Sequence, residues 1–261
     1  MYKQLIINVS DHETRVALLE DGTIAELYID RGDDSDVAGN IYKGKVLRVL
    51  PGMQAAFVDI GLNQAAFVYV DDVYTNDIEE YKRLFQVDSD ELPAETDSNP
   101  EPIRYESRRR YQIEELISEG QEILAQVVKS PIGTKGARIS SYVSLPGRFL
   151  VLMPKSDHIG ISRRIEDEIE RERLRNSVVN LRTNNHGYIV RTAAEGESEE
   201  KLASEMSFLN NLWANIQKKY EKAPAPFRLH QEISVSLRAV RDLLIHEVEK
   251  LVVDSKPTYN S

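Results

Sequence analysis

Two phenylalanines occupy matching places in successive short apolar segments, Ala55-Ala-Phe57-Val-Asp59 and Ala65-Ala-Phe67-Val68. Rings beside cations bind single-stranded nucleic acid, because bases stack on them for about 1–3 kcal/mol each and cations contact the phosphates. The same phenylalanines would equally serve as core residues, and their spacing alone does not decide between the two roles. Nearby basic residues suit the first role: Lys43, Lys45, Arg48, Lys129, Lys135 and Arg138.

A second candidate is the segment Gly187-Tyr-Ile-Val-Arg191-Thr192-Ala193, where a strand pattern ends in an arginine and a threonine. A guanidinium fork beside a hydroxyl suits a terminal phosphate, because arginine bonds two phosphate oxygens at once. The alternative is an ordinary exposed arginine. A third candidate is Gly160-Ile-Ser162-Arg163-Arg164-Ile165, in which Ser162 would cap a following helix and the arginines would bind an anion or simply be solvated.

From the residues alone we find no catalytic centre. The five histidines lack metal-ligand spacing, and the adjacent pairs Asp33-Asp34 and Asp71-Asp72 point apart on a strand. The absence of cysteine excludes disulfides, thiolate zinc sites and a cysteine nucleophile. With 33 basic against 43 acidic residues the net charge is −10, so any nucleic-acid binding must be local.

These residues need strands to position them. Residues 2–29 predict a three-stranded meander with a hairpin turn at Asp21-Gly22. Five short strands with Gly and Pro between them predict a small closed barrel: 40–50, 54–60, 65–70, 122–129 and 137–143. Residues 71–120 form a long insertion, with a short helix expected at 78–85 and a basic, aromatic stretch at 104–111.

After the barrel the pattern becomes mixed α/β. Strands are expected at 148–153, 187–192 and 250–253, and helices at 164–182, 198–222 and 233–246. In the long helix, apolar residues step by four and three and predict a core-facing stripe: Leu202, Met206, Leu209, Trp213, Ile216 and Tyr220. No apolar stretch approaches the roughly 20 residues of a membrane-spanning helix, and the first residues do not form a signal peptide. We therefore expect a cytoplasmic protein.

Eight stretches give the chain a close resemblance to the amino-terminal part of the bacterial ribonuclease E/G family. They are Ala38-Gly-Asn-Ile-Tyr-Lys-Gly-Lys-Val, Gln54-Ala-Ala-Phe-Val-Asp-Ile-Gly, Glu119-Gly-Gln-Glu-Ile-Leu-Ala-Gln-Val, Lys135-Gly-Ala-Arg-Ile-Ser, Leu145-Pro-Gly-Arg-Phe-Leu-Val-Leu-Met-Pro, Gly160-Ile-Ser-Arg-Arg-Ile, Ile189-Val-Arg-Thr-Ala and Pro224-Ala-Pro-Phe. The resemblance implies an endoribonuclease, a magnesium-dependent hydrolase of rRNA processing and mRNA decay that prefers single-stranded RNA with a 5′-monophosphate.

The implied fold class is α+β, with a five-stranded OB-type barrel inserted in an incomplete RNase H-like subdomain and followed by an α/β 5′-sensor subdomain. The RNase H-like parts are expected at residues 1–37 and, truncated, at 236–261. The S-one-like RNA-binding barrel is expected at 38–141, with its insertion at about 71–120, and the sensor at 142–235. Family members also form homo-oligomers.

The resemblance also assigns residues. Phe57, Phe67 and Lys135 fall on the family's RNA-contacting barrel positions. Gly147 and Val151 fall where backbone groups approach the terminal phosphate and its base, and Arg191 and Thr192 fall where the phosphate itself is held. Glycine permits such close approach.

The family's magnesium-binding carboxylates, in an Asp-x-Asn motif and a later Asp, lie on a DNase I-like domain that would begin beyond residue 261. We therefore expect no catalytic or metal-binding residue here, no cofactor for this chain alone, and RNA binding without cleavage. Two alternatives stay open. The chain is an independently active nuclease, which magnesium-dependent cleavage would reveal, or it is a scaffold whose basic, aromatic insertion binds a protein. The scaffold hypothesis predicts that deleting 88–112 abolishes function while alanine at Phe57 and Phe67 does not.

Overall fold

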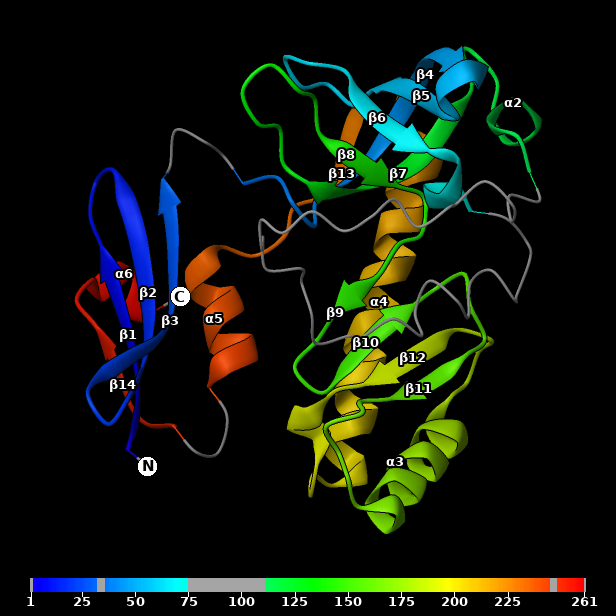
Figure 1. Ribbon diagram of the computed structural model, residues 1–261. Coiled ribbons are helices and arrows are strands. Elements are labelled where there is room, and N and C mark those ends of the chain that lie inside the picture. The colour runs from blue at the N-terminus through cyan, green and yellow to red at the C-terminus, as the bar shows by residue number, and fades with distance from the viewer. Residues whose placement is uncertain (1, 32–35, 75–110, 245–247, 261) are drawn as a thin grey trace, which may run out of the picture. The chain divides into compact units, whose positions relative to one another are not determined.

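A computed structural model describes residues 2–31, 36–74, 111–244 and 248–260 of the chain. The chain forms two compact units, one made of Met1–Val37 with Gln231–Ser261 and the other of Ala38–His230. Figure 1 shows the strands and helices of each. The helix expected at 78–85 lies outside the described residues.

The first unit is a four-stranded sheet in the order β14-β1-β2-β3. Its meander is confirmed, with a tight turn in which Asp21 and Gly22 both have positive φ, 49° and 82°. Helix α5 packs on the sheet and buries Ala239 against Leu5, Ile7 and Val16. The bounds are β1 Lys3–Val9, β2 Glu13–Glu20, β3 Thr23–Arg31, α5 Val235–Leu243, β14 Val248–Val253 and α6 Lys256–Tyr259.

The second unit begins with the barrel, whose five predicted strands are confirmed. Strand β4 pairs with both β5 and β7, and β6 pairs with β8 in parallel, so the sheet closes on itself. Glycine allows the close approach of β4 and β5 at one point, because a Cβ at Gly44 would lie 2.7 Å from the Val58 side chain. The bounds are β4 Ile41–Leu50, η1 Pro51–Met53, β5 Ala55–Asp59, β6 Ala66–Tyr69, η2 Val70–Asp72, α2 Ile113–Leu116, β7 Glu122–Lys129 and β8 Arg138–Ser140.

The rest of the second unit is a four-stranded sheet, β11-β12-β10-β9, packed with two helices. The core-facing stripe predicted for the long helix is confirmed, because Leu202, Met206, Leu209, Trp213 and Ile216 are buried. Helix α4 runs from this sheet toward the barrel (Figure 1). The bounds are β9 Leu145–Pro146, β10 Leu150–Met153, β11 Ile159–Ile161, α3 Glu168–Leu181, β12 Gly187–Val190, η4 Thr192–Ala194, α4 Glu199–Lys222 and β13 Phe227–His230.

The predicted mixture of helices and strands, α+β, is thus confirmed, with local differences. Helix α3 begins at Glu168 rather than 164, because the Asp167 side chain accepts a hydrogen bond from the Ile169 N–H and caps the helix there. Helix α5 is likewise shorter than 233–246, starting after the Ser234 cap. Strand β13, unpredicted, adds to the barrel beside β4. Among the helices in the described part of the chain, none is long and apolar enough to cross a membrane.

Candidate nucleic-acid interface

Aromatic and basic residues form one row across four strands of the barrel. Phe57 on β5 lies opposite Phe67 on β6. Arg48 on β4 lies opposite Phe57, and Arg138 on β8 lies opposite Phe67. The strand register therefore places a cation at each end of a pair of rings, and we call these four residues the barrel row.

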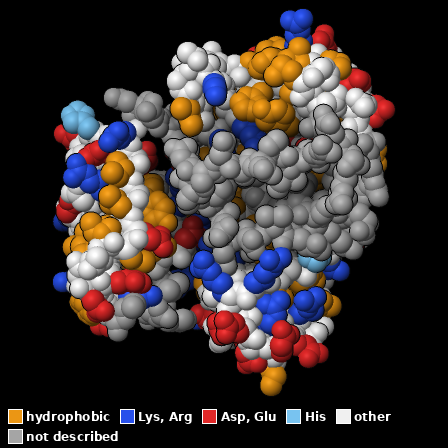
Figure 2. Space-filling view, viewed as in Figure 1, with side chains coloured by type: hydrophobic (Ala, Val, Ile, Leu, Met, Phe, Trp, Pro, Cys, Tyr) orange, Lys and Arg blue, Asp and Glu red, His pale blue; other side chains and the backbone are white. Residues whose placement is uncertain are grey.

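The rings of the barrel row belong to the outer surface of the barrel. Phe57 is 39% exposed, between Ala56 and Val58, which are buried. Phe67 is half-buried, and its ring meets that of Tyr69 edge to face with 5.4 Å between centroids. Figure 2 shows hydrophobic side chains gathered on the surface of the barrel. A pair of rings that is partly exposed in this way suits base stacking.

Tyr69 is a residue that sequence reasoning missed. It is 38% exposed, and the Arg138 guanidinium lies 5.5 Å from its ring centroid. Its signal was available, because a residue two positions after Phe67 on a strand points to the same face. Tyr69 thus extends the aromatic surface along β6.

The basic residues near the barrel row differ in exposure and in whether an acidic side chain pairs with them. Lys129 and Lys135 are exposed, Lys135 in the turn between β7 and β8. Arg138 is half-exposed and paired with Asp72 at 2.9 Å. Burial raises the pKa of the Asp72 carboxyl, while the charge of Arg138 pulls it down.

Lys43 corrects one expectation. The sequence predicts that Lys43 is one of the basic residues near the two phenylalanines that contact phosphate. In the structure, Lys43 is only 7% exposed. Its ammonium lies 2.8 Å from the Glu122 carboxylate and donates to the Tyr220 carbonyl oxygen at 3.1 Å. A buried, paired lysine of this kind joins the barrel to α4 rather than contacting a ligand.

Arg191 and Thr192 follow β12 and lie beside the turn between β9 and β10. Arg191 Nη1 donates to the Gly147 carbonyl oxygen at 2.7 Å, and its N–H donates to the Phe149 carbonyl oxygen at 2.8 Å. Thr192 Oγ1 lies 3.0 Å from Ser162 Oγ. The structure therefore brings two of the sequence candidates, Arg191-Thr192 and Ser162, to one place together with Gly147.

Gly147 and Val151 frame the same turn. The Gly147 N–H donates to the Leu150 carbonyl oxygen at 2.7 Å, which closes the turn. Val151 is half-buried and pairs with Ile189 and Pro146 in the sheet. The backbone N–H and carbonyl oxygen of Gly147 are thus both engaged in hydrogen bonds within the chain. Figure 2 shows Lys and Arg side chains grouped over this α/β part.

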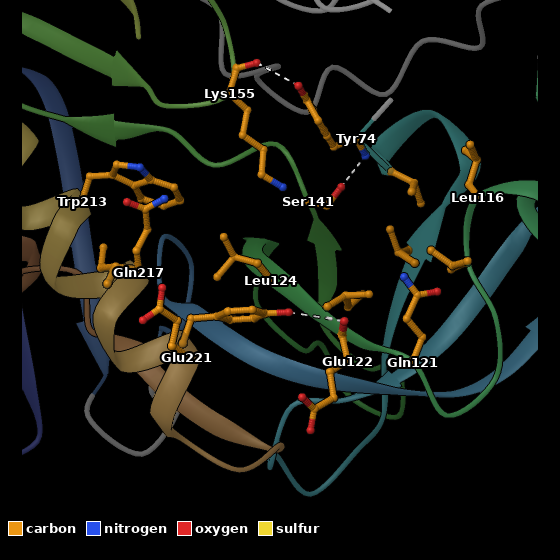
Figure 3. Close-up of a pocket in the computed structure, with 16 residues that line it drawn as sticks. Tyr74, Leu116, Gln121, Glu122, Leu124, Ser141, Lys155, Trp213, Gln217 and Glu221 are labelled. Carbon is orange, nitrogen blue, oxygen red and sulfur yellow. Dashed lines mark hydrogen bonds between the residues drawn. The ribbon is translucent and has the colours of Figure 1, made fainter. Parts of the chain in front are cut away.

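A pocket of about 380 Å³ lies between the barrel and α4, and sequence patterns contained no signal for it. Figure 3 shows the Lys155 side chain extending into it toward Ser141, with Trp213 at one side. The Lys155 ammonium lies 4.6 Å from the Tyr74 ring centroid, and burial lowers the pKa of Lys155. The pocket marks where the barrel and the α/β part meet within one unit.

Within residues 2–31, 36–74, 111–244 and 248–260, no three His, Asp or Glu side chains converge as metal ligands. An Asp-x-Asn triplet, Asp97-Ser98-Asn99, does occur in the chain and lies outside the described residues. The described residues do not fit a magnesium site, and we assign no step to a metal.

The sequence is similar to those of known ribonucleases. The model of the "Ribonuclease E/G family" matches residues 144–261. The chain is 40% identical to Ribonuclease G of Salmonella typhimurium (strain SL1344) and of Escherichia coli (strain K12), covering 100% of this chain and 49% of each. It is 35% identical to Ribonuclease E of Escherichia coli (strain K12) over 97% of this chain and 22% of that protein. The chain thus spans about half the length of the Ribonuclease G relatives.

Proposed function

We propose that the chain belongs to the Ribonuclease E/G family, whose model matches residues 144–261 and whose member Ribonuclease G is 40% identical over the whole of this chain. We propose further that it is the RNA-binding and 5′-end-sensing part of an endoribonuclease. In this proposal the enzyme acts in rRNA processing and mRNA decay in the cytoplasm, and its preferred substrate is single-stranded RNA with a 5′-monophosphate. Magnesium-dependent hydrolysis and self-association belong to the whole enzyme; the residues described here bind and orient the RNA.

The barrel row is the observation that carries the proposal. Two rings on neighbouring strands, each flanked by an arginine, offer a base a flat apolar surface and its phosphates a cation. Such a surface accepts any base, because every base has an aromatic face. Lys135 adds an exposed cation in the turn beside β8. The row therefore favours single strands, whose bases are free to stack.

The second half of the proposal concerns the RNA end. The Arg191 guanidinium donates to the Gly147 carbonyl oxygen, and the hydroxyls of the next residue, Thr192, and of Ser162 lie 3.0 Å apart. A terminal monophosphate carries more acceptor oxygens and more charge than an internal phosphate, and a guanidinium binds two of those oxygens at once. Val151 lies in the adjoining strand, where we place the first base. A bulkier 5′-triphosphate would fit such a site less well.

The experiment compares three RNAs of one sequence by fluorescence anisotropy: 5′-monophosphate, 5′-hydroxyl, and the 5′-hydroxyl strand annealed to its complement. We expect affinity to fall in that order. Equal affinity for the two single strands would refute the end sensor, and equal affinity for the duplex would refute the barrel row. A gel of the RNA after incubation with magnesium tests the separate expectation that this chain does not cleave.

A further inference from the structure

We propose that Glu205 is a positioning residue of the end-sensing site, acting through the turn between β9 and β10 to aim Arg191 at the phosphate. The inference rests on the proposed function and deepens it. It concerns a side chain on α4 that no motif or family resemblance marked.

Both oxygens of the Glu205 carboxylate accept hydrogen bonds from the backbone of that turn. One oxygen accepts from the Arg148 N–H at 2.7 Å, and the other accepts from the N–H groups of Phe149 and Leu150 at 2.8 Å each. Three successive N–H groups converging on one point form a nest for an anion. Glu205 is the anion, supplied by the chain itself.

Gly147 shows how closely the carboxylate is packed. A Cβ built on Gly147 would lie 2.6 Å from Glu205 Cδ and 2.8 Å from Oε1. No Cβ tolerates such a contact, so any larger residue at 147 would displace the Glu205 carboxylate from the three N–H groups that it accepts from. The glycine is needed for Glu205 as well as for a ligand.

The turn fixes the position of Arg191 through two hydrogen bonds. The Gly147 carbonyl oxygen accepts from Arg191 Nη1 at 2.7 Å, and the Phe149 carbonyl oxygen accepts from the Arg191 N–H at 2.8 Å. Both carbonyls belong to residues at or beside the N–H groups that Glu205 holds. If the turn moves, the guanidinium loses its support.

This arrangement also limits which hydrogen-bond donors can bind the terminal phosphate. Because Glu205 occupies the N–H groups of residues 148–150, those groups are not available to a phosphate. The phosphate is then held by the side chains of Arg191 and Thr192, and its recognition depends on where Arg191 points. Glu205 thus controls the preference for a 5′-phosphate without contacting RNA.

The first arm of the test needs no RNA. In Glu205→Gln, an amide NH₂ replaces one acceptor, so at least one backbone N–H loses its partner. We expect the amides of residues 148–150 to exchange with deuterium about tenfold faster than in wild type, as for the loss of about 1.4 kcal/mol of local protection. Glu221→Gln, the same charge change at an exposed position of α4, is the control and should leave that exchange unchanged.

The second arm measures the ratio of affinities for 5′-monophosphate and 5′-hydroxyl RNA. Glu205→Gln should lower this ratio about tenfold while the 5′-hydroxyl affinity stays close to that of Glu221→Gln. Gly147→Ala should act similarly by displacing the carboxylate, and adding it to Glu205→Ala should cost nothing further.

The two arms separate the possible failures. Unchanged exchange at residues 148–150 in Glu205→Gln would overturn the proposal, and so would faster exchange with a fully retained phosphate preference. A wild-type chain without phosphate preference would refute the proposed end sensor instead, while the exchange arm would still decide whether Glu205 holds the turn.

Discussion

At the scale of single residues, the site depends on neighbours that lie far apart in the sequence. The two rings of the barrel row belong to adjacent strands, and their flanking arginines come from β4 and β8. Each side chain alone is ordinary. Their proposed common role in binding RNA depends on the strand register, which sets them in one line across the barrel.

Phe57→Ala should weaken binding of single-stranded RNA by about 1–3 kcal/mol whatever its sequence, because one stacking surface is lost. Anisotropy with a pyrimidine-rich and a purine-rich RNA would measure it. Phe208→Ala removes an even more exposed ring, 65% exposed, from α4 and should leave the affinity unchanged. If both variants lose the same affinity, stacking on the barrel row is not the cause.

Arg191→Ala should abolish the preference for a 5′-monophosphate and leave the affinity for 5′-hydroxyl RNA nearly unchanged, because the guanidinium is the proposed ligand of the terminal phosphate. The matched control is Arg175→Ala, which removes an exposed arginine from α3. Equal losses on both RNAs would mean that the end sensor and the barrel row are not separate sites.

At the scale of elements, α4 organises the second unit. One face carries the buried stripe from Leu202 to Ile216, and Glu205 projects from the same helix to the β9–β10 turn. The loop before the helix is tied to α3, because Glu170 accepts from the Gly196 N–H and Arg173 donates to the Glu197 carbonyl oxygen. Packing and polar contacts thus fix the helix that holds the site.

Glu170→Gln should lower the thermal midpoint at pH 7 by about 2–4 °C, as expected from about 1 kcal/mol. The hydrogen bond from Arg173, together with that from Gly196, holds the pKa of Glu170 below its usual 4.5. A lowered pKa in the folded state means that this stabilisation is present above pH 4.5 and is lost as the pH falls through the lowered value.

The difference between wild type and Glu170→Gln should therefore shrink as the pH falls below 4.5, which thermal unfolding at several pH values would detect. Glu172→Gln, at an exposed position of the same helix, is the control. A difference that stays constant down to pH 3 would contradict the electrostatic origin.

At the scale of the whole molecule, the net charge of −10 repels a polyanion, so binding must come from local cations. The exposed basic residues near the barrel row provide them, whereas Lys43 is buried and paired. Affinity should therefore fall with salt despite the acidic composition, with a slope set by the few phosphates contacted.

Lys135→Ala should reduce the slope of log affinity against log salt by about 0.7, the value for one phosphate contact on a single strand. Titrations at four salt concentrations would measure it. Lys250→Ala removes an equal charge from β14 in the other unit and should leave the slope as it is. A slope unchanged by Lys135→Ala would remove this residue from the proposed interface.

Sequence patterns alone were sufficient for the five barrel strands, the meander and the buried stripe of α4. These features are local or periodic, since alternation, glycine turns and a three-and-four spacing are written in neighbouring residues. The residues proposed to bind RNA were also found there, Phe57 and Phe67 by their matching places and Arg191 by its position after a strand.

Only the tertiary structure decided which side chains are exposed to a ligand and which are buried or engaged in contacts within the chain. It buried Lys43, added Tyr69 to the aromatic surface and brought Glu205 to the turn at Gly147 across 58 residues of chain. These outcomes depend on strand register and helix packing between distant segments. No local pattern encodes such contacts, because each exists only after segments far apart in the chain have folded against one another.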